Sequence, residues 1–239
     1  MQKNKLNILS TRPLSASIVA EALKEGVYID CISFIETEPV KSPEIKQEIQ
    51  QLSGQNIVAV FTSMNAVEAV KEYISLKTDW KIFSIGQTTK ELIEDFFGKE
   101  NIAGTADDAE LLADVIIHQH LKEVVFFCGD QRRDELPEKL IANNIIVEEI
   151  LVYRTIATSQ KTVKHYDGIL FFSPSAVQSF FSTNTINNST IVFAIGNTTA
   201  NVVKKQVNNQ IVVADKPGKE ELVKKMLEYF SKEKQRIDE

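Results

Sequence analysis

The sequence predicts an α/β protein composed of two doubly wound parallel-sheet lobes that are related by an internal duplication. Two observations carry this prediction. Short apolar runs, typical of strands buried on both faces, alternate with longer amphipathic patterns typical of helices. In addition, residues 61–96 resemble residues 171–206, at a constant separation of 110 positions. Because each copy encodes the same order of strands and helices, the repeat predicts two structurally related lobes.

The repeated segment contains the clearest strand-to-helix patterns. FTSMNAVEAV (61–70) matches FFSPSAVQSF (171–180), and KIFSIGQTTK (81–90) matches IVFAIGNTTA (191–200). Each begins with apolar residues, turns at small or hydroxyl-bearing residues and continues with a helical pattern. The apolar runs that we predict as buried strands are residues 57–61, 81–85, 123–127, 168–172 and 190–194.

A second pair of similar segments, residues 7–39 and 124–157, predicts a further strand, loop, helix, turn and strand in each lobe. Gly26 ends the helical pattern of the first segment. Asn143 and Asn144 end that of the second, as residues that stop helices commonly do. Together the two pairs of segments supply two complete sets of elements.

The assignment of these segments to lobes has two solutions. The polar segments 36–44 and 155–161 are both candidate crossovers between lobes. If both cross, the middle of the chain, residues 42–150, forms one lobe and the two ends form the other. Alternatively, the chain divides once, near residue 118. The residues alone leave both solutions open.

The composition is that of an ordinary globular protein. The chain has 239 residues, of which 43% are hydrophobic and 25% charged, and its formal net charge is −6. This negative charge argues against nucleic acid as a partner. The sequence has neither a run of about 18 apolar residues nor a signal-peptide core. We therefore expect a cytoplasmic protein with no membrane partner, and a monomer, because no pattern marks a large exposed apolar face.

Neither the cysteines nor the histidines predict a metal or redox site. Cys31 and Cys128 are far apart and lie in or beside apolar runs, so we expect both to be buried and unreactive. His118 and His120 are two positions apart and would not share a helix face. The glycine-rich patterns of dinucleotide and nucleoside triphosphate sites are also absent from the sequence. The residues therefore indicate no metal or nucleotide.

The repeated loops are the candidate ligand site, because ligands of open α/β sheets bind beyond the carboxyl ends of the strands. Each loop opens a helix, whose unpaired N–H groups and positive dipole end favour an anion. Gly86 and Gly196 are expected to let the backbone turn tightly or approach a ligand. Arg12, Arg132 and Arg133 lie in the loops of the second segment pair and would add positive charge. Serine and threonine are also ordinary helix caps, so the residues alone leave a structural role open.

Six motifs, in their order and spacing, resemble the uroporphyrinogen-III synthase family over nearly the whole chain. They are FTSMNAV (61–67), SIGQTT (84–89), CGDQRRDELP (128–137), VYRT (152–155), FFSPSAV (171–177) and AIGNTTA (194–200). The resemblance implies two α/β lobes joined by a two-stranded linker. It selects the discontinuous division, with residues 1–35 and 157–239 in one lobe, residues 42–150 in the inserted lobe, and residues 36–41 and 151–156 as linker strands.

The resemblance also implies an activity. Enzymes of this family are cyclising hydro-lyases of porphyrin and heme biosynthesis, which close hydroxymethylbilane, a linear tetrapyrrole rich in carboxylates, into uroporphyrinogen III. The reaction takes place in the cleft between the lobes, with loss of water and inversion of ring D, and without a cofactor or metal. Closure without the enzyme gives the uninverted isomer, so the enzyme must mainly hold one geometry.

The resemblance further implies the site residues. Tyr153 matches a tyrosine near the cleft and is the candidate acid that assists loss of the hydroxyl group. A tyrosine that only packs at the linker strand is the alternative. The substrate contacts that the resemblance implies are Ser63, Thr89, Ser173, Ser175 and Thr199, and Arg133 matches a basic position in the family's loop. The predicted set of substrate-binding residues also includes Arg12, Gly86, Gly129 and Gly196.

Two other classes of function remain open at this point. One is a non-catalytic, two-lobed binding or sensor module for an anionic small molecule. The other is a transferase that binds a sugar nucleotide between twin lobes. Retention of Tyr153 and of both Gly-x-Thr-Thr turns favours the enzyme over the binding module. The missing nucleotide fingerprint counts against the transferase.

Overall fold

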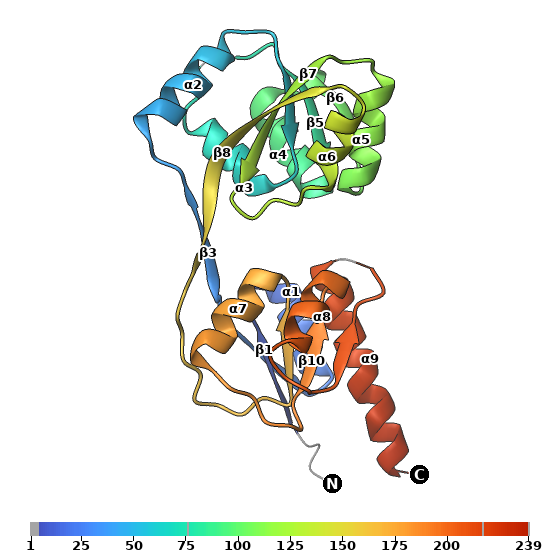
Figure 1. The fold of residues 1–239 in the computed structure, drawn as a ribbon. Coiled ribbons are helices and arrows are strands. Elements are labelled where there is room, and N and C mark those ends of the chain that lie inside the picture. The colour runs from blue at the N-terminus through green and yellow to red at the C-terminus, as the bar shows by residue number, and fades with distance from the viewer. Residues whose placement is uncertain (1–4, 76, 217, 239) are drawn as a thin grey trace. The chain divides into compact units, whose positions relative to one another are not determined.

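Two β-sheets, each flanked by helices, organise the chain (Figure 1). The computed structural model describes residues 5–75, 77–216 and 218–238. All described strand pairs within the repeated segments are parallel. The predicted α/β fold class is therefore confirmed.

The chain divides into two compact units. Unit 1 comprises the described residues up to Glu36 and those from Ile156 onward, and unit 2 comprises Thr37–Thr155. Two strands carry the chain from one unit to the other, namely β3 (Ile35–Pro39) and β8 (Ile146–Ala157). These strands are neighbours at one edge of the unit 2 sheet.

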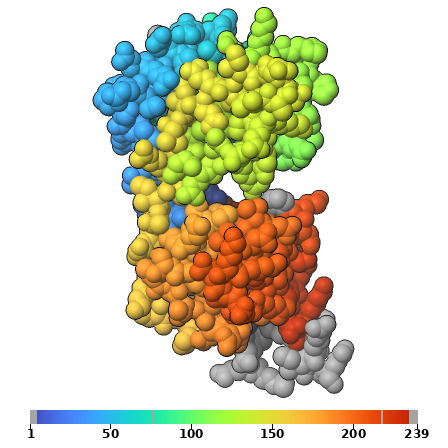
Figure 2. All heavy atoms as spheres, viewed as in Figure 1, coloured from blue at the N-terminus to red at the C-terminus, as the bar shows by residue number. Residues whose placement is uncertain are grey.

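Unit 1 contains a parallel five-stranded sheet with the order β11-β10-β9-β1-β2. Its strands are β1 (Leu6–Ser10), β2 (Val27–Cys31), β9 (Gly168–Phe171), β10 (Ile191–Ala194) and β11 (Ile211–Val213). Its helices are α1 (Ala16–Lys24), α7 (Pro174–Thr183), α8 (Asn197–Lys204) and α9 (Lys219–Asp238). Apolar residues of α7 and α8 cover one face of the sheet, and those of α1 and α9 cover the other. In the space-filling view the side chains of α7 and α8 hide the central strands (Figure 2).

Unit 2 contains a six-stranded sheet with the order β3-β8-β7-β4-β5-β6. Its other strands are β4 (Val58–Phe61), β5 (Lys81–Ile85), β6 (Ile102–Ala106) and β7 (Glu123–Gly129). Its helices are α2 (Pro43–Ser53), α3 (Met64–Lys71), α4 (Gln87–Phe97), α5 (Ala109–His118) and α6 (Glu135–Ala142), with a 3-10 turn, η1, at Lys99–Asn101. α2, α3 and α4 pack on one face, and α5 and α6 pack on the other. Because both faces are covered, the central strands are mostly apolar.

The two sheets repeat one topology. The strands β9, β10 and β11 of unit 1 correspond to β4, β5 and β6 of unit 2, and β1 and β2 correspond to β7 and β8. With this correspondence the unit 1 order β11-β10-β9-β1-β2 becomes the unit 2 order β6-β5-β4-β7-β8. The segments that match in sequence therefore occupy equivalent places, as an internal duplication requires.

The predicted helix stops are confirmed. α1 ends at Lys24, and Gly26 follows with a φ of 79°. α6 ends at Ala142, and Asn144 follows with a φ of 60°. Positive φ values reverse the chain after a helix, and glycine and asparagine adopt them with the least strain.

The prediction for the cysteines is correct for one residue and wrong for the other. Cys128 is buried in β7, and burial raises the pKa of its thiol to about 11, so it is protonated at neutral pH. Cys31 is exposed, because it ends the edge strand β2, which has no further strand beside it. Among the described residues no helix is long and apolar enough to cross a membrane.

Candidate active site

The four repeated loops all follow strands at their carboxyl ends, and two of them are built around serine caps. Ser63 precedes α3, and its Oγ accepts a hydrogen bond from the N–H of Asn65 at 3.1 Å. Ser173 precedes α7, and its Oγ accepts from the N–H of Ala176 at 3.2 Å. Each serine thereby satisfies one of the unpaired donors of its helix.

The threonines of the other two loops, which were predicted as substrate contacts, are buried. Thr89 in α4 is only 6% exposed and Thr199 in α8 only 2%, so their side chains offer almost no surface to a ligand. Both face the core, because each lies one helical turn before a buried apolar residue, Ile93 or Val203. This spacing is visible in the sequence and would have predicted their burial.

The exposed polar groups of these two loops come from the neighbouring positions. Gln87 and Thr88 are exposed at the start of α4, and Asn197 and Thr198 are exposed at the start of α8. The sequence analysis did not single out these residues. They occupy equivalent positions in the two units and are the polar side chains exposed at these helix starts.

Gly86 and Gly196 occupy equivalent positions but differ in backbone conformation. Gly86 has a φ of 76° and a ψ of 153°, a combination that is essentially limited to glycine. Gly196 has a φ of −174°, which any residue adopts. A Cβ atom added at either position would have no neighbour within 4 Å. The backbone therefore favours glycine at position 86 and not at position 196, and the close approach of a ligand to either residue stays a prediction.

This difference predicts unequal effects of alanine at the two positions. We expect Gly86→Ala to lower the free energy of unfolding by about 1–3 kcal/mol, because the strained conformation must be kept or relieved. We expect Gly196→Ala to change it by no more than about 0.5 kcal/mol. Urea denaturation of both variants measures the effects, and each serves as the control for the other. Equal losses would contradict the backbone explanation.

The three arginines of the second loop pair are in different electrostatic states. Arg132 donates to Glu149 from Nε at 2.5 Å and from its terminal nitrogen at 2.9 Å, and it also pairs with Asp134. Its charge is therefore offset, contrary to the expectation that it would add positive charge to the site. Arg133 is largely exposed, with its nearest carboxylate, that of Glu135, at 4.0 Å.

Arg12 is exposed after β1 and has a second cation beside it. Partial burial and the Arg12 guanidinium together lower the pKa of Lys219, the first residue of α9. Two cations held near each other at the carboxyl end of the unit 1 sheet favour an anion. The sequence analysis missed Lys219, because its proximity to Arg12 depends on the fold.

Tyr153 lies beside two other residues that the resemblance implied. Its ring covers Gly129, where an added Cβ would lie 2.3 Å from Cζ of the tyrosine. Its phenol is hydrogen-bonded to the side chain of Ser63. Gly129 ends β7, Ser63 lies just after β4, and Tyr153 is paired with Gly129 in β8; these three strands are adjacent in the sheet. The structure therefore brings these three residues together within unit 2.

The protonation of Tyr153 is set by this environment. Burial raises the pKa of the phenol above its ordinary value of 10.0, the hydrogen bond from Ser63 lowers it, and the nearby Cys128 and Asp130 raise it. The net effect is a raised pKa, so the phenol keeps its proton at neutral pH. Tyr153 is therefore a hydrogen-bond donor or weak acid there.

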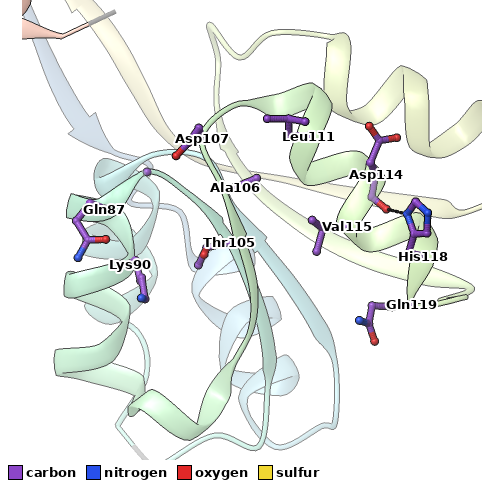
Figure 3. Close-up of a pocket in the computed structure, with 11 residues that line it drawn as sticks. Gln87, Lys90, Thr105, Ala106, Asp107, Leu111, Asp114, Val115, His118 and Gln119 are labelled. Atoms are coloured by element: carbon purple, nitrogen blue, oxygen red, sulfur yellow. Dashed lines mark hydrogen bonds between the residues drawn. The ribbon is translucent and has the colours of Figure 1, made fainter.

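A pocket of about 660 Å³ lies in unit 2 between α4 and α5, over the edge strand β6 (Figure 3). Gln87 and Lys90 line it from α4, and Asp114 and His118 line it from α5. Gly86 also lines the pocket, which therefore adjoins one of the repeated loops. Its charges are partly offset, because Lys90 lies 3.7 Å from Glu94 and Asp114 lies 2.8 Å from Lys139.

Comparisons with known proteins agree on one family. The family model described as uroporphyrinogen-III synthase HemD matches residues 16–224. The crystal structure of uroporphyrinogen-III synthetase from Helicobacter pylori has a TM-score of 0.66 at 16% identity, covering 94% of this chain and 99% of that one. A mutant uroporphyrinogen III synthase from the extremely thermophilic bacterium Thermus thermophilus has a TM-score of 0.61 at 13% identity, covering 97% and 99%.

At these low identities the solved structures establish a shared fold. A search of curated protein sequences found no significant match. The family assignment rests on the sequence model, which covers most of the chain from α1 into α9. This chain therefore belongs to the uroporphyrinogen-III synthase family.

Proposed function

We propose that this chain closes hydroxymethylbilane into uroporphyrinogen III, with loss of water and inversion of ring D, and without a cofactor or metal. Family membership supports the reaction. The observation that supports specific residues is the position of Tyr153, whose ring lies over Gly129 at the end of β7 and whose phenol is hydrogen-bonded to Ser63 just after the adjacent strand β4. The proposed site therefore contains an acid beside helix starts that favour carboxylates.

In the proposed first step Tyr153 protonates the hydroxyl group that leaves ring A. The C–O bond breaks, water departs, and the pyrrole nitrogen of ring A supplies the electrons that stabilise the remaining carbon. The tyrosinate then takes up the N–H proton of that ring, which restores the phenol and leaves an azafulvene. Ring D attacks this azafulvene through its substituted carbon, and the resulting spiro intermediate opens and closes again with ring D inverted.

The substrate carboxylates are proposed to bind at the repeated loops of both units, at the carboxyl ends of the two sheets. The helix starts of α3, α4, α7 and α8 supply N–H donors, each worth roughly 0.3–1 kcal/mol at an exposed position. The proposed cationic contacts are Arg12 with Lys219 and the exposed Arg133. Backbone donors and local cations allow a polyanion to bind although the formal net charge of the chain is −6.

The exposed threonines test this assignment. We expect Thr88→Ala and Thr198→Ala each to raise KM by about tenfold with little change in kcat, because a lost hydrogen bond to a charged group costs about 1.5–3 kcal/mol. Steady-state kinetics with hydroxymethylbilane generated in place measure both constants.

The matched control is Thr89→Val, which changes a buried neighbour of nearly the same shape. We expect this variant to alter stability while KM stays close to that of the unchanged protein. An unchanged KM in both exposed-threonine variants would remove these helix starts from the proposed site.

Independence from metals and cofactors has its own test. The protein would be dialysed against a chelator, and the fraction of type III product would be compared before and after dialysis. We expect no change. A loss that added metal restores would contradict this part of the proposal. The cytoplasmic location and the monomeric state stay predictions, and light scattering after gel filtration measures the latter.

A further inference from the structure

Tyr153 lies on an unexpected face of its strand. Successive side chains of a strand point to opposite faces of the sheet. Val152 and Tyr153 are successive, yet both pack against the same cluster of apolar residues beneath α3 and α4. The alternation of β8 is therefore interrupted at this point.

The interruption is a bulge between β7 and β8. Cys128 pairs with Leu151, but the next residue, Gly129, pairs with Tyr153, so Val152 has no partner in β7. A bulge of this kind rotates the following side chain and re-aims it. Here it turns the Tyr153 ring to the face of the sheet on which a side chain at position 129 would lie.

The ring has room on that face only because residue 129 is glycine. A Cβ atom there would lie 2.3 Å from Cζ, 2.5 Å from Cε2 and 2.8 Å from Oη of Tyr153. These distances are shorter than real carbon contacts, so the ring would have to move. Gly129 is not among the residues with positive φ, so its backbone does not itself require glycine. The close approach of Tyr153 is the reason for glycine at this position.

Ser63 fixes the far end of the ring. Its Oγ is already an acceptor for the N–H of Asn65 at 3.1 Å. The Ser63 side chain is also hydrogen-bonded to the phenol of Tyr153. A serine oxygen that accepts from a backbone N–H still has its own hydrogen to donate, and a phenol oxygen that accepts that hydrogen keeps its own proton for a substrate.

We propose that Gly129 and Ser63 are positioning residues for Tyr153, and that neither acts primarily as a substrate contact. Gly129 and the bulge set where the ring lies, and Ser63 sets where its oxygen points. This inference rests on the proposed role of Tyr153 as the acid. It replaces the role in substrate binding that the family resemblance implied for both residues.

The Gly129→Ala variant tests the inference through kinetics. We expect kcat to fall by about 100-fold, the order of loss caused by a displacement of about 1 Å at a reacting group, while KM stays within about twofold. In a Tyr153→Phe background the same substitution should cause no further fall in kcat. A Gly129→Ala variant with unchanged kcat, or one with raised KM and unchanged kcat, would overturn the inference.

Gly104→Ala is the matched control for crowding. A Cβ at Gly104 would lie 2.9 Å from the side chains of Phe83 and Val115, in the same sheet but away from Tyr153. We expect this variant to lose stability, measured by urea denaturation, without the 100-fold loss in kcat. If Gly104→Ala lowers kcat as far as Gly129→Ala does, the effect is general destabilisation and the inference is wrong.

Ser63 is tested by comparing its loss with the loss of an ordinary helix cap. Ser63→Ala removes both hydrogen bonds, whereas Ser63→Thr keeps a hydroxyl group that can make both. Ser42→Ala removes an equivalent cap at α2, where Oγ accepts from the N–H of Ile45 at 3.1 Å. We expect Ser63→Ala and Ser42→Ala to lose similar stability, and only Ser63→Ala to lower kcat. Ser63→Thr should recover most of the rate. Equal kcat in the two alanine variants would overturn the role of Ser63.

A titration distinguishes failure of this inference from failure of the proposed function. Phenolate formation by Tyr153 is followed by ultraviolet difference spectroscopy, with Tyr153→Phe as the reference. Ser63→Ala should move this titration to higher pH, because the lost hydrogen bond stabilised the phenolate. If the titration moves but kcat does not, the acid role of Tyr153 fails. If the titration stays in place, the positioning by Ser63 fails.

Discussion

The Tyr153→Phe variant is expected to lose about 10²–10⁴-fold in kcat, the contribution typical of a positioned acid. The substitution removes only the phenol oxygen and keeps the ring that lies over Gly129. KM should therefore change little. Because uncatalysed closure continues and gives the uninverted isomer, the product should shift from type III to type I as the catalysed rate falls. The measurement is the rate of formation of each isomer.

Tyr166→Phe is the control for loss of a tyrosine hydroxyl. Tyr166 lies in unit 1, and its hydroxyl donates to Asp30 at 3.1 Å. We expect this variant to keep its kcat. If Tyr153→Phe keeps most of its rate as well, Tyr153 is not the acid.

The same assignment predicts a pH dependence. The raised pKa of Tyr153 lies above 10.0, so the phenol is protonated through the neutral range. The acid function should therefore be complete at neutral pH and be lost only as the pH rises through this pKa. A fall in kcat between neutral pH and pH 10 that is absent in Tyr153→Phe would assign a different, lower pKa to the residue.

The largest effect on stability is expected from Trp80→Ala. The Trp80 ring stacks on Phe97 at 5.5 Å and on Phe127 at 5.4 Å, between ring centres, and it is 1% exposed. Its Nε1 donates to the carbonyl of Leu52 at 3.0 Å. Removing the ring leaves a cavity in the unit 2 core and an unpaired carbonyl. The expected loss in free energy of unfolding is about 3–5 kcal/mol.

Urea denaturation followed by circular dichroism measures this loss, because Trp80 is the only tryptophan of the chain and its fluorescence disappears with it. Trp80→Phe is the control, since it keeps an aromatic ring and removes the hydrogen bond to Leu52. We expect it to lose clearly less stability than Trp80→Ala. Equal losses would mean that the stacked rings contribute little.

The fold was predictable from the sequence because the two copies of the duplication are similar over continuous segments of the chain. The apolar runs 57–61 and 168–172, which lead into FTSMNAV and FFSPSAV, became β4 and β9, and these are equivalent central strands of the two sheets. Burial of a residue near a sheet edge was less predictable. Cys31 follows apolar residues, but its exposure depends on β2 being an edge strand, and strand order is not visible in a single sequence.

The site was only partly predictable, because its decisive contacts join distant residues. Tyr153 was found through its motif, whereas the bulge that turns it over Gly129 depends on the pairing of β7 with β8. Likewise, the pairing of Arg132 with Glu149 joins residues of different elements. The burial of Thr89, in contrast, could be predicted from the sequence, because the residue lies one helical turn before Ile93.

The isomer composition of the product tests the central claim most directly. Hydroxymethylbilane would be generated in place in the presence of the protein, the products would be oxidised, and type I and type III uroporphyrins would be separated by chromatography. We predict an excess of type III that depends on the folded protein and disappears when it is unfolded. Type I alone, from protein that circular dichroism shows to be folded, would contradict the account and favour a binding module without turnover.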